Sequence, residues 1–470
     1  MAQGERIDRR HLMFGLALPW LGPGVRQAGP RAPRILLRGS WQSVNIGDIG
    51  HTPGALQLIE RYFPEAEVTL WPGRLEHGSR ELLTKAFPRL RILDIGTPAD
   101  RRDAIGPDGR PQSAELAAAW DSADFMLHGS GSGFSARAQL AAWHRTTGKA
   151  YGVFGTSADP ISGFGTGRDP EGGTLKNLRA RMAALPPNHL DRETRSVVDG
   201  AAFIFTRETL TRDYFRSQGV RCPIVEFGPD SQLGMRLRDD QRAAEYLKAH
   251  ALAHRQYLCV IPRLRYTPYY RINNVPRTKD DDVRDAINER TTASDHARLR
   301  DMIAMYVRRT GHRVLACPEM IHEIPLAKEV LVDPLPDDVR SHVVWRDSFW
   351  LPDEAASVYA SAQAVVSMEC HSPLIALTNG TPAFYVRQPT DTCKGQMYRD
   401  LWLGDWCFEI EETTGAALWE QLARIHARPA DAAGSVRAFT QRVERLQRRM
   451  VDVLKTAVNK ASSSARAPAR

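Results

Sequence analysis

The run AVVSMECHSPLIALTNGTPAFYV, from Ala364 to Val386, decides the fold. Its first four residues are apolar enough for a short buried strand, and a tight polar turn follows them. The spacing then predicts a short helix over 372–379, with Gly380 and Pro382 leading into a second strand. A strand, a turn and a helix in this order are typical of an open α/β sheet, whose ligands bind beyond the carboxyl ends of its strands.

His371 lies in the turn of this run, where the predicted helix begins. A helix N-terminus offers unpaired N–H groups and a partial positive charge that suit an anionic ligand. A histidine alone could equally cap this turn or pack against it. The motif Asn45-x-Gly47-Asp48, which comes after the first predicted strand, favours a functional interpretation of His371.

The rest of the chain alternates strands with helices. Residues 34–39 form the first predicted strand, a polar glycine turn is predicted over 40–50, and a helix is predicted from Thr52 to Tyr62. The apolar run at 257–261 opens a second series of about the same size. Two such series predict an α/β protein with two Rossmann-like, doubly wound domains facing a cleft, where their ligand loops meet.

This pattern predicts the divisions of the chain. They are an N-terminal domain over 34–237, a linker helix over 238–256, a second domain over 257–412, C-terminal helices over 413–460 and a disordered tail over 461–470. Residues 266–295 are expected to be irregular, with Asp280–Asp282 in a solvated loop or helix cap, and a helix is expected over 296–310. The last long helix is expected over 435–458.

Composition restricts the class of protein. The 470 residues carry a net charge of +8, but the basic residues are spread along the chain without a nucleic-acid-binding motif, so no nucleic-acid partner is expected. No stretch approaches the ~20 apolar residues of a membrane span, so no transmembrane segment is expected. Six scattered cysteines without a CxxC pair indicate neither a disulfide scaffold nor a zinc site, and no metal is expected.

The first 33 residues differ from the rest of the chain. Arg9 and Arg10 precede a modest apolar run that ends near Leu21, and small residues and prolines come next. This order resembles a twin-arginine export signal, although an aspartate precedes the two arginines. The alternative is an N-terminal extension of a cytoplasmic protein.

Two glycine-containing turns carry candidate ligand groups. Asn45 and Asp48 offer an amide and a carboxylate to sugar hydroxyls, and Gly47 allows the backbone to approach a ligand closely. A turn and helix cap built by the same residues is the alternative. The run Gly129, Ser130, Gly131, which continues to Gly133, comes after a strand and could cradle phosphate with its N–H groups, although it lacks the lysine of a P-loop.

Basic residues come after the strands of the second series. Arg263 and Arg265 lie directly after the strand at 257–261, where two guanidinium groups could bind phosphate or carboxylate. Lys394 could add a charge to the same anion site, but a solvated loop lysine is the simpler interpretation. Arg207 lies just after a predicted strand at 201–205 and is a further candidate loop residue.

Together these features resemble the polysaccharide pyruvyl transferase family, over most of residues 34–410. The resemblance is carried by five short features in order: Asn45-x-Gly47-Asp48, the Gly129–Gly133 loop, the strand followed by Thr206-Arg207-Glu208, the strand ending at Arg263, and the segment 367–382. The last feature is similar to the family's strand, Arg-x-His, helix and Gly-x-Pro. Glu369 stands where the family has arginine, so a neighbouring arginine would have to neutralise it to keep an anion site there.

The resemblance implies a fold like that of the GT-B glycosyltransferases and a transferase activity. Pyruvate would pass from phosphoenolpyruvate, a small phosphate donor and co-substrate, to a carbohydrate acceptor of a cell-surface or exopolysaccharide, as a ketal. No other cofactor is implied. His371 would be the general acid or base. Arg263, Arg265, Glu369 and Lys394 would belong to the donor side, and the N-terminal loops would face the acceptor.

Two other functions remain open from the sequence. A GT-B glycosyltransferase that uses a nucleotide sugar would need the same fold and glycine loops. A diverged, non-catalytic glycan-binding protein of the cell envelope would agree with Glu369 and with the signal-like N-terminus.

Overall fold

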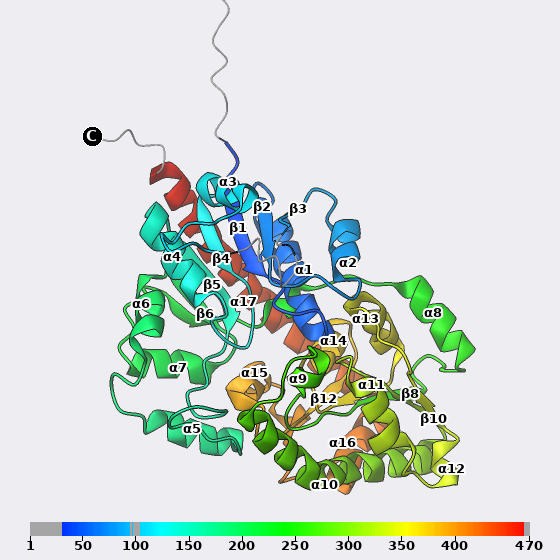
Figure 1. The fold of residues 1–470 in the computed structure, drawn as a ribbon. Helices are drawn as coiled ribbons and strands as arrows, with labels where there is room; N and C mark the ends of the chain where they lie inside the picture. The colour runs from blue at the N-terminus through cyan, green and yellow to red at the C-terminus, as the bar shows by residue number, and fades with distance from the viewer. Residues whose placement is uncertain (1–30, 95, 97–103, 465–470) are drawn as a thin grey trace, which may run out of the picture. The chain divides into compact units, whose positions relative to one another are not determined.

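The structure is a computed structural model that describes residues 31–94, 96 and 104–464. Residues 33–470 form one compact unit, which holds two parallel β-sheets (Figure 1). The signal-like run with Arg9 and Arg10 lies outside the described residues. No helix in the described ranges is both long and apolar enough to cross a membrane.

The first sheet, as far as the chain is described, has seven strands in the order β3-β2-β1-β4-β5-β6-β7, and all neighbours are parallel. Its strands are β1 (Arg34–Gly39), β2 (Glu67–Pro72), β3 (Arg91–Ile92), β4 (Phe125–His128), β5 (Tyr151–Thr156), β6 (Phe203–Thr206) and β7 (Val225–Phe227). The strand order reverses between β1 and β4. In a doubly wound sheet this point is where a ligand crevice opens.

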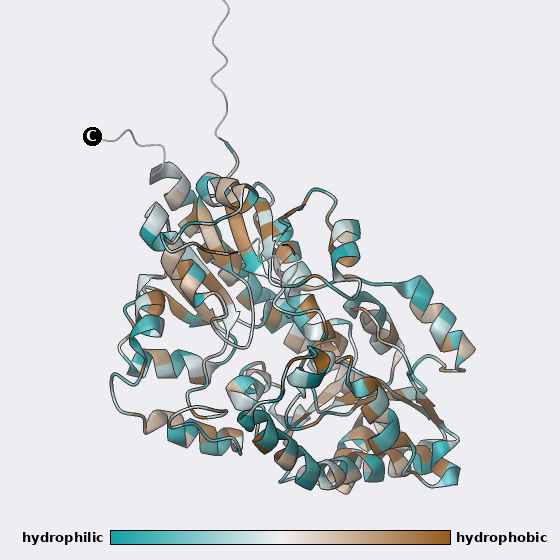
Figure 2. Ribbon diagram, viewed as in Figure 1, coloured by the Kyte–Doolittle hydropathy of each residue, from teal (hydrophilic) through white to brown (hydrophobic). Residues whose placement is uncertain are grey.

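The second sheet repeats the plan with six strands in the described chain, in the order β10-β9-β8-β11-β12-β13, again all parallel. Its strands are β8 (Tyr257–Ile261), β9 (Arg313–Ala316), β10 (Val343–Trp345), β11 (Ala364–Ser367), β12 (Ala383–Arg387) and β13 (Cys407–Glu409). Its order reverses between β8 and β11. The central strands β8 and β11 are buried along their whole length, because helices cover both faces of a parallel sheet (Figure 2).

Helices fill the connections between the strands. In the first half they are α1 (Ile46–Tyr62), α2 (Ser79–Ala86), α3 (Ala114–Ser122), α4 (Arg137–Thr147), α5 (Leu175–Ala183), α6 (Arg192–Gly200), α7 (Thr209–Ser217) and α8 (Asp240–Ala249). In the second half they are α9 (Tyr269–Ile272), α10 (Lys279–Thr310), α11 (Glu323–Ala327), α12 (Asp337–Arg340), α13 (Pro352–Ser361), α14 (His371–Thr378), α15 (Gln396–Asp400), α16 (Gly415–Ala427) and α17 (Pro429–Ser464). Short turns of helix also occur at η1 (Ser231–Gly234), η2 (Lys328–Val332), η3 (Thr392–Gly395) and η4 (Gly404–Trp406).

The strand, turn and helix expected in the run from Ala364 to Val386 are confirmed as β11, α14 and β12. Helix α1 differs from its expected start at Thr52, since it begins at Ile46 and includes Gly47 and Asp48. Asn45 causes the early start, because its side-chain oxygen accepts hydrogen bonds from the N–H groups of Gly47 and Asp48 at 2.7 and 3.1 Å. The polar turn predicted over 40–50 is therefore partly helix.

The irregular segment expected over 266–295 is wrong for most of its length, because α10 begins at Lys279. Thr278 and Asp281 form a capping box, and Asp280–Asp282 occupy the first turn, as a helix cap requires. The helix was hidden in the sequence because its buried side includes polar residues, among them Asp285 and Asp295. The linker helix expected over 238–256 is likewise shorter, at 240–249.

The last helix, α17, is longer than the expected 435–458 and returns to the first sheet (Figure 1). Met450, Leu454 and Val458 belong to one buried apolar cluster with Leu37 of β1 and Phe205 of β6. Residues 461–464 are helical rather than disordered, whereas 465–470 lie outside the described residues. The C-terminal helices therefore complete the core of the N-terminal half.

Candidate active site

A cavity of about 410 Å³ lies where loops from the two sheets meet. The loops after β1, β8 and β11 contribute to its lining, and these strands flank the two points where the strand order reverses. Eight of the residues predicted from sequence line the cavity: Asn45, Asp48, Arg207, Arg263, Arg265, Glu369, His371 and Lys394. Gly47, Gly129, Ser130 and Gly131 are not among its lining residues.

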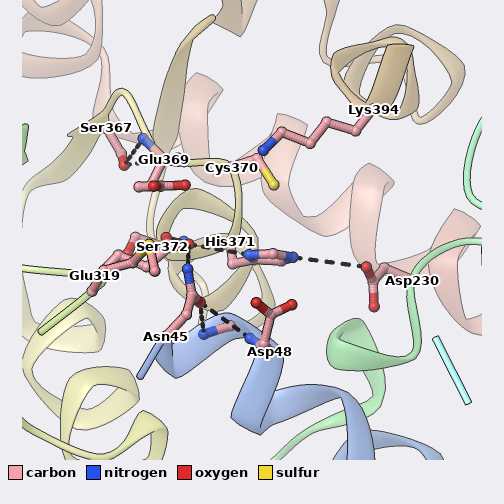
Figure 3. Close-up of polar contacts among 12 residues, drawn as sticks. Asn45, Asp48, Asp230, Glu319, Ser367, Glu369, Cys370, His371, Ser372 and Lys394 are labelled. Atoms are coloured by element: carbon pink, nitrogen blue, oxygen red, sulfur yellow. Dashed lines mark hydrogen bonds and ion pairs between the residues drawn. The ribbon is translucent and has the colours of Figure 1, made fainter. Parts of the chain in front are cut away.

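His371 is the first residue of α14, and its ring lies between two buried carboxylates (Figure 3). Its Nδ1 is 3.1 Å from Glu319 Oε1. Its Nε2 is 3.9 Å from Asp230 Oδ2 and has no hydrogen-bond partner among the described residues. A carboxylate beside Nδ1 keeps a proton on that nitrogen, so Nε2 is the nitrogen left without a hydrogen-bond partner.

Glu319 is fully buried and fixes this part of the site. Its Oε2 accepts a hydrogen bond from the N–H of Ser372 at 2.5 Å, and its Oε1 accepts one from Asn45 Nδ2 at 3.2 Å. The backbone N–H of Ile46 also donates to the Glu319 carbonyl at 3.0 Å. Glu319 thus joins helix α1 of the first half to the start of α14 in the second.

These contacts set the charge of the pair. Burial alone would raise the pKa of Glu319, but hydrogen bonds from His371 and the Ser372 N–H lower it. Burial disfavours a charged His371 ring, yet the Cys370 sulfur and the Glu319 carboxylate together raise the pKa of His371 well above its ordinary value. The geometry therefore favours an imidazolium paired with a carboxylate.

Gly47 has a packing role that differs from the predicted approach to a ligand. A Cβ atom at this position would lie 2.1 Å from both Cβ and Cγ of His371. Glycine is therefore needed so that α1 can lie directly against the catalytic candidate. Asn45 likewise acts first as the cap of α1, which is the alternative considered from the sequence, while Asp48 faces the cavity.

Arg263 neutralises Glu369. Its Nε lies 2.7 Å from Glu369 Oε1, and its Nη1 contacts Asp391 and, at 3.0 Å, the side-chain oxygen of Gln388. Nε and Nη1 of Arg263 are therefore occupied within the protein, and its expected role in binding an anion stays a prediction. Glu369, which stands where the family has arginine, therefore has Arg263 as its counter-ion.

Arg265 is also engaged. It forms two contacts with Asp295, at 2.8 and 3.0 Å, and its Nη1 lies 2.8 Å from Glu411. Its expected role in binding an anion likewise stays a prediction. Arg265 still lines the cavity and contributes positive charge to it.

Lys394 and Arg207 are two further basic residues that line the cavity. Lys394 is on the turn η3 and its side chain is 15% exposed, so the simpler interpretation as a solvated loop lysine is wrong. Its ammonium lies 3.6 Å from Asp391. Arg207 is buried and donates from Nη1 to Asp230 at 2.9 Å and from Nε to Ser157 at 3.1 Å. Its Nη2 is buried without a hydrogen-bond partner in the described chain.

A sequence model of one protein family covers most of this chain. The polysaccharide pyruvyl transferase model matches residues 45–388, from the cap of α1 to the residue after β12. The chain belongs to the polysaccharide pyruvyl transferase family. No curated protein matches it. The expected family is thus confirmed, and the matched range contains every cavity residue named above except Lys394.

Solved structures agree on the fold of this family member. A putative UDP-N-acetylglucosamine 2-epimerase from Listeria monocytogenes is 12% identical and superposes with a TM-score of 0.53, over 90% of this chain and 96% of that chain. Anabaena HepE in complex with UDP and glucose is 11% identical, with a TM-score of 0.51, over 90% of this chain and 100% of that chain. Staphylococcus aureus MnaA with UDP is 10% identical, with a TM-score of 0.52, over 91% and 97% of the two chains. These similarities show a GT-B-like pair of α/β domains.

In the Gly129–Gly133 loop of this pyruvyl transferase family protein, the N–H groups of both Gly129 and Gly131 are used within the first sheet. The N–H of Gly129 donates to the Arg38 carbonyl at 2.8 Å, and that of Gly131 donates to the Gly155 carbonyl at 3.3 Å. Ser130 accepts from the Ser231 N–H at 2.9 Å. These groups join strands of the first sheet, so they are not available to a ligand.

Three residues of the candidate site were missed from the sequence: Glu319, Asp230 and His51. Glu319 lies after β9 and Asp230 lies after β7, so both are at the carboxyl ends of strands, where the rule that identified His371 also applies. His51 lies one turn after Asp48 on α1 and its Nε2 is 3.1 Å from Asp230 Oδ2. It could have been found only by starting α1 at Asn45, which places both residues on one face.

Proposed function

We propose that this protein transfers pyruvate from phosphoenolpyruvate to two hydroxyl groups of a carbohydrate, forming a ketal and releasing phosphate. The observation that carries the proposal is the pair of Glu319 and His371, because His371 lines the cavity and its Nε2 has no hydrogen-bond partner among the described residues. Membership of the family gives the reaction class. The buried pair gives a proton donor of the kind that the reaction needs.

The first step requires a proton on carbon 3 of the enol phosphate. His371 donates it from Nε2 while a sugar hydroxyl attacks carbon 2, and the hydroxyl proton passes to the carboxylate of Asp48 across the cavity. This step forms one C–H and one C–O bond and removes the carbon–carbon double bond. Glu319 stabilises the charged ring before the transfer and keeps Nε2 directed at the substrate.

The second step exchanges phosphate for the second hydroxyl. The bond from carbon 2 to the phosphate oxygen breaks, and phosphate leaves with its electron pair. The second sugar oxygen takes its place and gives its proton to Nε2 of His371, which the first step left neutral, while the proton held by Asp48 passes to the phosphate. The unpartnered Nη2 of Arg207 and the ammonium of Lys394 are the cationic groups suited to the leaving phosphate. Because Arg263 neutralises Glu369, that glutamate does not repel the donor as a free carboxylate would.

The test is phosphate release by the full chain with phosphoenolpyruvate and a panel of sugars. We expect His371→Gln to lower the rate by about 10²–10⁴-fold, the usual contribution of general acid–base catalysis. His254→Gln, at an exposed histidine, is the matched control and should leave the rate unchanged. Equal rates for the two variants would remove His371 from the mechanism.

Binding separates this reaction from nucleotide-sugar chemistry. A donor present at 100 times its dissociation constant stabilises the fold by about 2.7 kcal/mol, which raises the melting temperature. We expect phosphoenolpyruvate to do so. A rise with UDP-glucose and none with phosphoenolpyruvate would favour a nucleotide-sugar enzyme, because a UDP-N-acetylglucosamine 2-epimerase and a complex with UDP-glucose are among the structural neighbours. No rise with either would favour a glycan-binding protein.

A further inference from the structure

Two histidines from different halves of the protein face the carboxylate of Asp48. His51 is on α1 and His371 begins α14, and their ring centroids are 5.2 Å apart with planes at 77°. One ligand atom from each of these residues and one from Asp48 lie within 4.8 Å of one another. The closest of these contacts joins His51 Nδ1 to Asp48 Oδ1 at 3.6 Å.

Each ring presents one buried nitrogen without a hydrogen-bond partner in the described chain. These atoms are Nδ1 of His51 and Nε2 of His371, and the two residues are 2% and 6% exposed. Buried polar atoms are normally hydrogen-bonded, and an unsatisfied pair that faces one carboxylate requires an explanation. A bound cation supplies one, since both nitrogens and the carboxylate can then donate electron pairs to it.

The remaining nitrogen of each ring is held by a buried carboxylate. Asp230 Oδ2 lies 3.1 Å from His51 Nε2, and Glu319 Oε1 lies 3.1 Å from His371 Nδ1. Metal-binding histidines usually donate their second ring N–H to a carboxylate in this way, which fixes the tautomer and strengthens the ligand nitrogen. The arrangement therefore occurs twice around the same point.

The local charge also favours a divalent cation. In the metal-bound form, in which His371 has given up its proton and both rings are neutral, the carboxylates of Asp48, Asp230 and Glu319 are opposed at this point by the guanidinium of Arg207 alone. Three negative groups against one positive group leave two negative charges in excess. The nearby cations Arg263 and Lys394 do not change this difference, because Glu369 and Asp391 pair with them.

We propose that Asp48, His51 and His371 bind one divalent first-row transition-metal ion. Two imidazoles and a carboxylate suit such ions, and three protein ligands leave a coordination position open, which here faces the cavity lined by Asp48 and His371. A ligand separation of up to 4.8 Å exceeds the roughly 3.4 Å expected between ligands of a tetrahedral ion. The three ligand groups therefore have to move closer together when the ion binds, and Asp48, whose side chain is 17% exposed, is the least buried of them.

The metal and a proton compete for Nε2 of His371. An ion bound there occupies the atom that donates the proton in the transfer proposed above, so the metal-loaded form is an inhibited form of the enzyme. Metal binding itself does not depend on that reaction. It can be measured without any substrate.

Cobalt gives a direct measurement. The untagged full chain, freed of metal with a chelator, is titrated with Co²⁺ while visible absorption is recorded, and Zn²⁺ is then added. We expect ligand-field bands that saturate at one Co²⁺ per chain and disappear as Zn²⁺ displaces the cobalt. Asp48→Asn and His51→Gln should each abolish the bands, and Glu319→Gln should weaken binding about 10–100-fold, as loss of an outer carboxylate does.

The matched control is His426→Gln. His312 and His426 form another edge-on histidine pair, with centroids 5.5 Å apart and planes at 71°, but they lie outside the cluster that could hold a metal. This variant should bind cobalt as the parent does. Thermal melting of each metal-free variant shows whether it is folded, and Asp48→Asn, at the most exposed ligand, decides the result if His51→Gln does not fold.

Three results would overturn the proposal. They are an unchanged cobalt spectrum in folded Asp48→Asn, an absence of saturable binding in the parent chain, and a thiolate-to-cobalt charge-transfer band. The last would assign the ion to one of the buried cysteines. Loss of phosphoenolpyruvate turnover would leave the cobalt result unaffected, so the two proposals can fail separately.

Discussion

His128 and His371 occupy equivalent positions in the two halves of the molecule. His128 ends β4, and His371 comes after β11, and each of these strands lies across the reversal of strand order from the first strand of its sheet. Both histidines are buried. Their electrostatic states nevertheless differ, because their hydrogen-bond partners differ.

His128 is surrounded by neutral backbone. Its Nδ1 lies 2.7 Å from the Gly129 carbonyl oxygen and its Nε2 accepts from the Ala136 N–H at 3.4 Å. Burial lowers the pKa of His128 to about 4. His371 instead has a carboxylate on one nitrogen and no hydrogen-bond partner on the other in the described chain, and its pKa is raised. The fold provides the position, and the neighbouring charged and polar groups determine whether the histidine there is neutral or charged.

The largest effect is expected from removing that carboxylate. Glu319→Gln keeps the size of the side chain but removes the charge that stabilises the His371 imidazolium, so phosphate release should fall by about 10²–10⁴-fold. Steady-state rates at saturating phosphoenolpyruvate measure the change. Gln388→Glu would add charge to the site and is therefore unsuitable as a control. The control is Glu226→Gln, which changes a carboxylate in the exposed pair with Arg449 and should leave the rate unchanged.

The neutral state of His128 predicts a loss of stability in acid. The unfolded chain takes up this proton near pH 6.5, whereas folded His128 does so only near pH 4. The stability contributed by the neutral ring is therefore complete above pH 6.5 and falls as the pH drops towards 4, by about 3 kcal/mol in total at 1.36 kcal/mol per pKa unit.

Urea unfolding between pH 7 and 4.5 measures this term. His296 and His322 also have a pKa lowered to about 4 by burial, so the parent protein should lose more stability than one histidine explains. The measurement therefore compares how steeply the unfolding free energy falls with pH in the parent protein and in the variant. His128→Gln should show a shallower fall of unfolding free energy with decreasing pH, and an identical slope would show that His128 is already charged when folded.

Gly47 tests how closely the first half must lie against His371. Gly47→Ala would place Cβ at 2.1 Å from that residue, and we expect a loss of about 1–3 kcal/mol of stability together with weaker phosphoenolpyruvate turnover. Gly133→Ala is the matched control beside His128, because no heavy atom lies within 4 Å of the added Cβ. Its unfolding free energy should change by less than about 0.5 kcal/mol.

The smallest effects are expected for two serines of the Gly129–Gly133 loop, which differ in their surroundings. Ser130 donates to the Phe154 carbonyl at 3.1 Å and accepts from Ser231 N–H at 2.9 Å, so Ser130→Ala should cost about 1–2 kcal/mol of stability. Ser132 is exposed and lines the cavity. Ser132→Ala should leave stability unchanged and weaken substrate binding. A reversed pattern, measured by urea unfolding and ligand titration, would restore the loop as a ligand cradle.

The sequence was informative where local pattern and function coincide. The run around His371 revealed its strand, turn and helix, and the alternation of elements predicted both parallel sheets. The partners of the site were harder to find. Glu319 and Asp230 are separated from His371 by 52 and 141 positions, and their approach depends on how the halves pack, which no local period records.

The partners of the two arginines were hard to predict for a related reason. A strand end predicts where Arg263 and Arg265 lie, and both do line the cavity. The sequence does not show that Asp391 and Asp295, on distant segments, already bind their guanidinium groups. Position depends on the fold class, whereas availability depends on every neighbouring charge.

The return of α17 to the first sheet has a consequence for synthesis on the ribosome. Synthesis of the first sheet is complete once Phe227 has been added. Its apolar face, however, is covered only when Met450, Leu454 and Val458 pack against it. At bacterial and eukaryotic elongation rates these residues emerge about 10–45 s later. The nascent N-terminal half therefore leaves the ribosome with an exposed apolar surface. A chain released early would be a substrate for chaperones and proteases.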